Sequence, residues 1–263
     1  MKTATILKYQ WKDLLRSKWI IGYALIYLLL SDGLIRFGGA GPKALLSIAN
    51  VILLFVPLVS MIYGALFLYQ SREFIELLLA QPLNRKSLYW GLFGSVSVPL
   101  AIAFLFGTGL PMVYNGILGA NSTISIVTIL SIGLLLTFLF TSLGFVFSLK
   151  FFNDKIKGLG FALVSWLILA VLYDGLVLMI VYLFGNYPLE KPVLVLSVLN
   201  PIDLARILVL LKFNISALMG YTGAVFNRFF GSQLGIYISL GCLLLWILIP
   251  LLWGLKLLRV KDF

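Results

Sequence analysis

The residue types that usually do chemistry are scarce in this sequence. Its 263 residues include no histidine, one cysteine, Cys242, and nine carboxylates. Cys242 lies in an apolar run, where a thiol behaves as a small hydrophobe. The soft metal ligands that remain are the thioethers of Met61, Met112, Met179 and Met219, which are scattered as core-filling methionines are. We therefore expect no catalytic residue, no metal site and no cofactor bound by this chain.

One ionisable residue stands alone in an apolar stretch. Asp174 lies midway along the run from Leu159 to Phe184. A charge at the centre of a membrane costs about 2.5–3.5 kcal/mol on insertion scales, and it usually marks an internal path or a polar partner. Asp174 is therefore a candidate for a transmembrane path or interface. The alternative is a neutral, hydrogen-bonded aspartic acid with a structural role between helices.

A glycine-rich stretch from Gly38 to Lys43 invites comparison with a phosphate-binding loop. It lacks the full spacing of that motif and the Ser or Thr that follows its lysine. The chain therefore carries no visible ATP-hydrolysing motif.

Long apolar runs dominate the chain, which is 62% hydrophobic and 11% charged. A helix needs roughly 20 residues to cross a bilayer, and strands of a membrane barrel would alternate apolar and polar residues, which these runs do not. We predict an all-α polytopic helical membrane protein, a single domain over 1–263, with six spans near Trp19–Ile35, Ala44–Leu68, Gly91–Leu110, Ile124–Leu149, Leu159–Phe184 and Gln233–Leu255.

The positive charges orient these spans. The segments before the first span and after the second, fourth and sixth hold 14 of the 20 Lys and Arg residues, and the alternate connections hold six. By the positive-inside rule both termini are cytoplasmic. The net charge of +11 thus reflects orientation in the membrane, and we expect no nucleic-acid partner because the basic residues form no patch with exposed aromatics.

The first 18 residues have the pattern of an amphipathic helix. Leu7, Trp11, Leu14 and Leu15 share one face, with basic residues beside it. Such a helix lies in the membrane interface, in contact with lipid. A plain basic topology signal is the alternative.

The cytoplasmic connection 71–87 is predicted to contain a short helix that Pro82 ends. Its apolar residues are opposed by acidic ones, so it is a candidate for coupling to a cytoplasmic partner, or else an interfacial connector without a partner. The candidate coupling residues are Glu73, Phe74, Glu76, Leu77 and Leu78.

The external segment 185–230 is too long for a simple turn. Asn200 and the proline after it form a strong helix start, and Asp203 suits the first helical turn. Arg206 is three residues later and can pair with Asp203. We expect a helix to about Lys212 that packs on the outer ends of the spans or enters the membrane boundary. These residues and Met219 are candidates for a gate or a surface for an external partner, with a packed loop as the alternative.

The whole chain resembles a known family. The basic amphipathic start, six spans, the loop ELLLAQPLNRKSL and the external insert are similar to the type 2 exporter permeases of ABC transporters. Within that family, the sequences WLILAVLYD (166–174), LNPID (199–203) with Arg206, and ALMG (217–220) most resemble permeases that serve the maturation of nitrous oxide reductase. The loop departs from the family where REFIE (72–76) replaces an acidic residue followed by Gly-Thr.

This resemblance implies a homodimer in the bacterial inner membrane with a separate, NosF-like ATPase subunit, which would bind the ATP and Mg. It also implies a periplasmic NosD-like partner and delivery of copper or a sulfur species for the copper centres of nitrous oxide reductase. A non-transporting scaffold or mechanotransmitting assembly factor is the alternative function. An enzyme acting in the membrane is disfavoured by the missing histidines and by the absence of a second carboxylate near Asp174 in its apolar run.

Overall fold

A computed structural model describes residues 18–38, 41–79, 84–116, 120–185, 190–212 and 233–260. Within these ranges all regular secondary structure is helical, which confirms the all-α prediction. Six helices there are long and apolar enough to cross a membrane, and they match the six predicted spans. The amphipathic helix predicted over 1–18 lies outside the described residues except for Lys18, and so do Pro82 and Met219.

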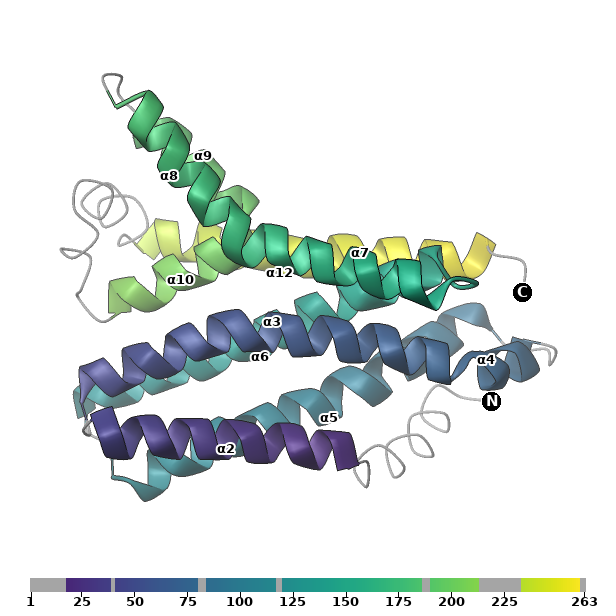
Figure 1. Ribbon diagram of the computed structural model, residues 1–263, viewed down its shortest axis with the longest axis horizontal. Helices are drawn as coiled ribbons and strands as arrows, with labels where there is room; N and C mark the ends of the chain where they lie inside the picture. The colour runs from purple at the N-terminus through teal and green to yellow at the C-terminus, as the bar shows by residue number, and fades with distance from the viewer. Residues whose placement is uncertain are drawn as a thin grey trace.

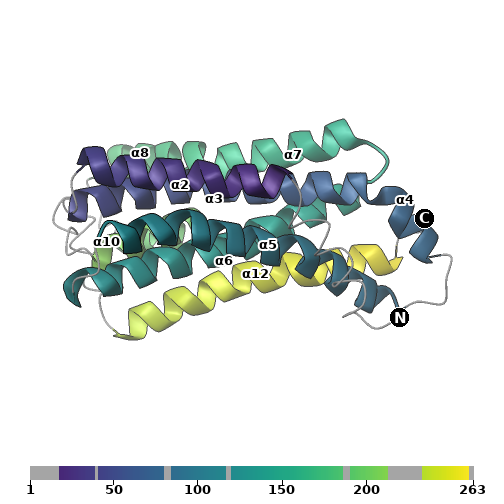
Figure 2. The same cartoon turned by 90° about the horizontal axis from the view of Figure 1, so that it is seen from below.

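The spans are long helices. They are α2 (Lys18–Gly38), α3 (Pro42–Gln70), α5 (Arg85–Tyr114), α6 (Ala120–Lys150), a fifth span made of α7 (Lys155–Leu167) and α8 (Tyr173–Leu183), and α12 (Gln233–Val260). The shorter helices are α4 (Arg72–Leu79), α9 (Glu190–Leu199) and α10 (Pro201–Lys212). Figures 1 and 2 show the long helices side by side as an elongated bundle, with α4 and the end of α12 at one end.

Several buried hydroxyls in the spans form hydrogen bonds within their own helices. Thr108, Thr137, Thr141 and Ser148 each donate to the backbone carbonyl four residues earlier, at 2.7–2.8 Å. This local bonding lets a polar side chain lie in an apolar environment.

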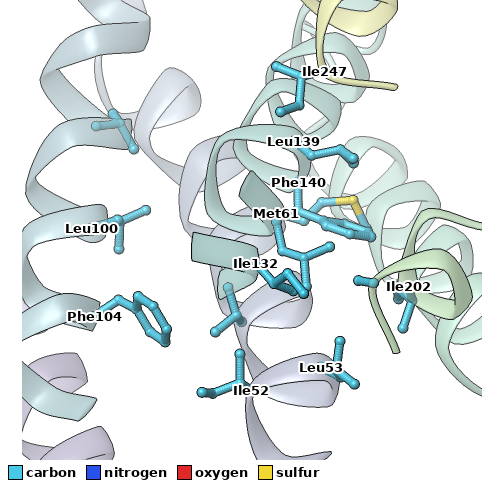
Figure 3. Close-up of a cluster of buried hydrophobic side chains, with 14 of the residues drawn as sticks. Ile52, Leu53, Met61, Leu100, Phe104, Ile132, Leu139, Phe140, Ile202 and Ile247 are labelled. Atoms are coloured by element: carbon cyan, nitrogen blue, oxygen red, sulfur yellow. The ribbon is translucent and has the colours of Figure 1, made fainter. Parts of the chain in front are cut away.

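The helices α3 and α6 approach each other closely. Gly144 of α6 lies against the backbone of Met61, so that a Cβ added at Gly144 would stand 2.3 Å from the Met61 carbonyl oxygen. Small residues at such contacts allow helix backbones to approach closely in a membrane. Met61 itself is fully buried in the core that these helices share (Figure 3).

The helix α10 lies inside the bundle. The expectation that it packs on the outer ends of the spans is therefore wrong. Ile202 belongs to the same core cluster as Leu53 and Met61 of α3 and Ile247 of α12 (Figure 3). The other buried apolar residues of α10 are Leu204, Ala205, Ile207, Leu208 and Val209. A helix that is apolar nearly all round is stable where it can bury every face, and this place between spans provides that.

The fifth span changes direction at its middle. A π-helical segment, η1 (Ile168–Leu172), separates α7 from α8, and the N–H of Tyr173 bonds to the carbonyl of Ile168, five residues earlier. Beyond it, α8 and α9 together stand away from the other helices (Figure 1). π-helical turns are local insertions that kink a helix and are frequent at functional sites.

Candidate functional site

The external segment turns back sharply at Asn200. The stretches Pro192–Leu199 and Pro201–Leu211 form a helix pair bent by 111°. Pro201 has no N–H and disfavours a helical conformation in the residue before it, so α9 ends there and α10 begins. The Asn200 Oδ1 accepts the N–H of Ile202 at 3.1 Å, which is the predicted N-cap.

The carbonyls freed at the end of α9 find partners on two spans. The Tyr173 hydroxyl donates to the Leu196 carbonyl at 2.6 Å, and the Trp246 indole N–H of α12 donates to the Val198 carbonyl at 3.2 Å. The last carbonyls of a helix have no partner within it, and inside a bundle water cannot replace one. These two side chains therefore hold the bend in place.

The bend is also bonded to η1. The Asn200 Nδ2 donates to the Leu169 carbonyl at 2.8 Å, and two residues before η1 the Trp166 indole N–H donates to the Leu54 carbonyl of α3 at 3.1 Å. The kinked part of the fifth span is thus held by α3 on one side and by the external segment on the other.

Asp174 finds its polar partner in the external segment. The Arg206 Nη1 lies 2.5 Å from the Asp174 Oδ2 and 3.4 Å from the Asp203 Oδ1. The predicted pairing of Asp203 with Arg206 is present, and Arg206 joins both carboxylates. The side chains of Arg206 and Asp174 are 31% and 35% exposed, and Asp203 Oδ1 makes no hydrogen bond to a described residue.

We call this arrangement the joint, and define it as η1, Asp174, Asn200, Asp203 and Arg206. Its members come from segments about 30 residues apart. It combines a kinked helix, a helix break and one arginine between two carboxyl groups. Among the described residues no group of three His, Cys, Asp or Glu side chains could hold a metal ion.

The helix α4 presents a mixed face at the opposite end of the bundle (Figure 2). Glu73, Phe74 and Leu77 are exposed, the last two at 40% and 69%. Leu78, which the sequence pattern grouped with them, is buried together with Ile75. The outward face therefore has an apolar pair beside an acid.

Glu76 is engaged within α4. It accepts a hydrogen bond from the Arg72 Nε at 2.8 Å, and the Arg72 guanidinium lies 5.1 Å from the centre of the Phe152 ring, in the next connection on this side of the bundle. Pairs four residues apart support a short helix, and an arginine over an aromatic ring adds to that support. Glu76 thus helps to hold α4 against the bundle.

The connection around α4 is joined to two spans that also form bonds next to the joint. Only Ser71 separates α4 from α3. After the connection, Asn84 caps α5 through the N–H of Lys86, and the Arg85 Nη1 donates to the Arg259 carbonyl of α12 at 2.6 Å. Leu54 of α3 accepts the Trp166 bond two residues before η1, and Trp246 of α12 donates to Val198 two residues before Asn200. The helices α3 and α12 therefore run from the end near α4 to bonds that flank the joint.

Two substitutions of Asn200 distinguish the contributions of its two side-chain hydrogen bonds, to the Leu169 carbonyl and to the Ile202 N–H. Asn200→Ala is expected to lower the free energy of unfolding by about 1–3 kcal/mol, because the Leu169 carbonyl and the first turn of α10 both lose a partner. Asn200→Asp keeps an acceptor for the cap but turns a carboxylate towards the Leu169 carbonyl, so it should be no better than alanine. Thermal unfolding of the purified chain measures both variants. If Asp restores the stability that Ala loses, the bond to η1 is unimportant.

Sequence reasoning identified Asp174, Asn200, Asp203 and Arg206 but not Trp166, Tyr173 and Trp246 as bonding residues. The signal that points to them is residue type, because buried Trp N–H and Tyr O–H groups usually find partners. No feature of the apolar sequence Ile168–Leu172 marks η1.

Comparison with known proteins identifies a matching family and two similar relatives. The family model described as ABC-2 family transporter protein matches residues 43–263. The "Probable ABC transporter permease protein NosY" of Pseudomonas aeruginosa is 29% identical over 237 residues, which cover 82% of this chain and 84% of the relative. The protein of the same name from Stutzerimonas stutzeri is 26% identical over 274 residues, covering 97% and 96% of the two chains.

Proposed function

The chain belongs to the ABC-2 family of transporter proteins. We therefore propose that it transmits a conformational change, driven by ATP hydrolysis in a separate ATPase subunit, from α4 to the joint. It is a NosY-like permease subunit of an ABC transporter, a class whose ATPase is another subunit. The ATP and Mg belong to that NosF-like partner. The proposal is carried by one observation: α4, at one end of the bundle, is linked through α3 and α12 to bonds that flank the joint.

The proposed orientation places α4 in the cytoplasm. It is supported by the Lys and Arg distribution and by the position of α4 at the same end as the last turn of α12 (Figure 1). Both termini would be cytoplasmic, and the connection between α8 and α9 would face the periplasm across the bacterial inner membrane.

The exposed face of α4 is the proposed docking surface for the ATPase. Leu77 and Phe74 are exposed apolar side chains of α4, and apolar side chains of this kind make good interface anchors. Glu73 beside them adds charge that helps to select the partner.

Leu77→Asp is expected to weaken co-purification of the ATPase by at least about tenfold, because burying an unpaired carboxylate in an apolar interface is unfavourable. The measurement is the ratio of ATPase to permease in detergent-purified complex. The matched control is Ile156→Asp, since Ile156 is 85% exposed in the first turn of α7, on the same side of the bundle. Equal ATPase recovery in both variants, or no ATPase recovered with the wild-type chain, contradicts this docking surface.

We further propose that two copies of the chain form the transporter. The fifth span supports this, because α8 has no buried residue and carries exposed Leu178, Met179 and Tyr182. A NosD-like periplasmic protein would then rest on the external segment, near the connection of α8 to α9. The expected process, which the sequence resemblance implies, is delivery of copper or a sulfur species for nitrous oxide reductase.

A mechanotransmitting assembly role is the second candidate, and the joint favours it. Asp174 is bonded to Arg206 and is not directed as a free ligand into an open path. Purified complex in sealed vesicles separates the two functions. ATP-dependent accumulation of copper(I) or of a sulfur compound supports transport, whereas hydrolysis without accumulation, together with ATP-dependent release of the periplasmic partner, supports the mechanical role.

A further inference from the structure

We propose that a groove along α2 binds one anionic phospholipid, with the phosphate at Lys18 and an acyl chain along the helix. The groove encloses about 730 Å³, a volume within the range of small-molecule sites. It lies between α2, α3 and the middle of α5. Its lining includes Lys18, Trp19, Gly22, Ile26, Phe55 and Val59.

The shape of the groove follows from helical spacing. Lys18, Gly22, Ile26 and Leu30 recur every four residues, so they form one stripe along α2. From Lys18 to Leu30 the stripe extends roughly 18 Å at 1.5 Å per residue. A site of this length and with this apolar lining suits a single extended alkyl chain.

Gly22 makes room for that chain. A Cβ built at Gly22 meets nothing within 4 Å, although neighbouring positions of α2 on the same face carry large side chains. The space beside Gly22 therefore belongs to the groove and is not filled by another helix.

The cation at the end of the groove defines the occupant. Lys18 is exposed at the first turn of α2 and makes no ion pair within the described part of the chain. Trp19 beside it is 76% exposed, and tryptophan favours the interface between membrane and water. Lysine binds phosphate as a point charge, and the cytoplasmic leaflet is rich in anionic lipid.

A second groove on α2 lacks any charged or polar side chain that could bind a lipid headgroup. It encloses about 260 Å³ between α2 and α5, and every residue that lines it is apolar. It has no group that distinguishes one lipid from another. The charge at Lys18 is what makes the larger groove selective.

Lipid titration of the detergent-purified full-length chain tests the proposal. Phosphatidylglycerol and phosphatidylcholine with the same acyl chains are added, and bound lipid is counted by native mass spectrometry. We expect one tight phosphatidylglycerol, and about fivefold weaker binding after Lys18→Gln. Gly22→Leu fills the groove and should weaken binding by about tenfold, without a clash in the protein.

Matched controls keep the test decisive. Gly33→Leu adds the same side chain at another open position of α2 outside the groove, and Lys256→Gln removes an exposed cation from α12. Both should bind lipid as the wild-type chain does. Equal affinity for the two lipids, or unchanged binding by Gly22→Leu, overturns the proposal. Displacement of the lipid by inorganic phosphate would identify a free anion as the ligand and would also overturn it.

Only the choice of leaflet rests on the proposed orientation. The titration is done in detergent, where both ends of the groove are accessible. A failure of lipid binding is therefore distinguishable from a failure of the proposed orientation or of ATPase coupling.

Discussion

Arg206→Gln is expected to be the most damaging single change at the joint. It leaves the carboxylates of Asp174 and Asp203 facing the same site with no cation between them, and like charges that lack a partner are strongly unfavourable in a bundle. Asp174→Asn should be milder, because Arg206 keeps its pair with Asp203. We expect losses of about 1–3 kcal/mol in stability, with Arg206→Gln at the upper end because two carboxyl groups lose their partner. The losses are limited by solvent screening, because the side chains of Arg206 and Asp174 are 31% and 35% exposed.

A double-mutant cycle measures this coupling. The double variant Asp174→Asn with Arg206→Gln should lose less stability than the two single losses added together. The readouts are the thermal midpoint of the purified chain and, in the assembled transporter, ATP-dependent activity, which we expect to fall by at least about tenfold with Arg206→Gln.

The control for the joint is an exposed ion pair. Lys157→Gln breaks the pair with Asp154, whose side chains are 67% and 40% exposed, and should leave the thermal midpoint almost unchanged. If Arg206→Gln is no more harmful than Lys157→Gln in both measurements, the joint has neither the structural nor the functional importance proposed for it.

Gly144→Ala is expected to prevent normal packing of α3 against α6. The new Cβ would stand 2.3 Å from the Met61 carbonyl oxygen and 3.1 Å from the Ala65 nitrogen. Both are backbone atoms, so no rotamer change relieves the overlap and the helices must separate. Overpacking usually costs about 1–3 kcal/mol and can cost more when it moves backbone.

Glycine-to-alanine changes at open positions of other spans serve as controls for Gly144→Ala. Alanine favours a helix over glycine by about 1 kcal/mol, and a Cβ at Gly160 or Gly241 meets nothing within 4 Å. Gly160→Ala and Gly241→Ala should therefore keep or raise the yield of monodisperse protein in detergent, while Gly144→Ala lowers it severalfold. A Gly144→Ala protein that elutes and melts like these controls would show that the α3–α6 contact is less tight than described.

The burial of Leu78 illustrates why a helical pattern leaves docking surfaces undecided. Phe74, Leu77 and Leu78 all lie within one arc of α4, and an arc of apolar residues can face either the bundle or a partner. Tertiary packing turns Leu78 inwards with Ile75 and leaves Phe74 and Leu77 outside. The orientation of α4 relative to α3 decides which of these residues face the bundle. A local sequence pattern does not specify that orientation.

The sequence by itself determined the six spans, because crossing a membrane requires about 20 consecutive apolar residues and that requirement is local. It also determined the helix start at Asn200 and Pro201, since capping involves neighbours in the chain. Only the tertiary structure decided the partner of Asp174, the bond from Asn200 to the Leu169 carbonyl and the burial of α10. These depend on segments far apart in the sequence that meet only when the external segment packs back into the bundle, where protein groups replace the hydrogen bonds that water would otherwise supply.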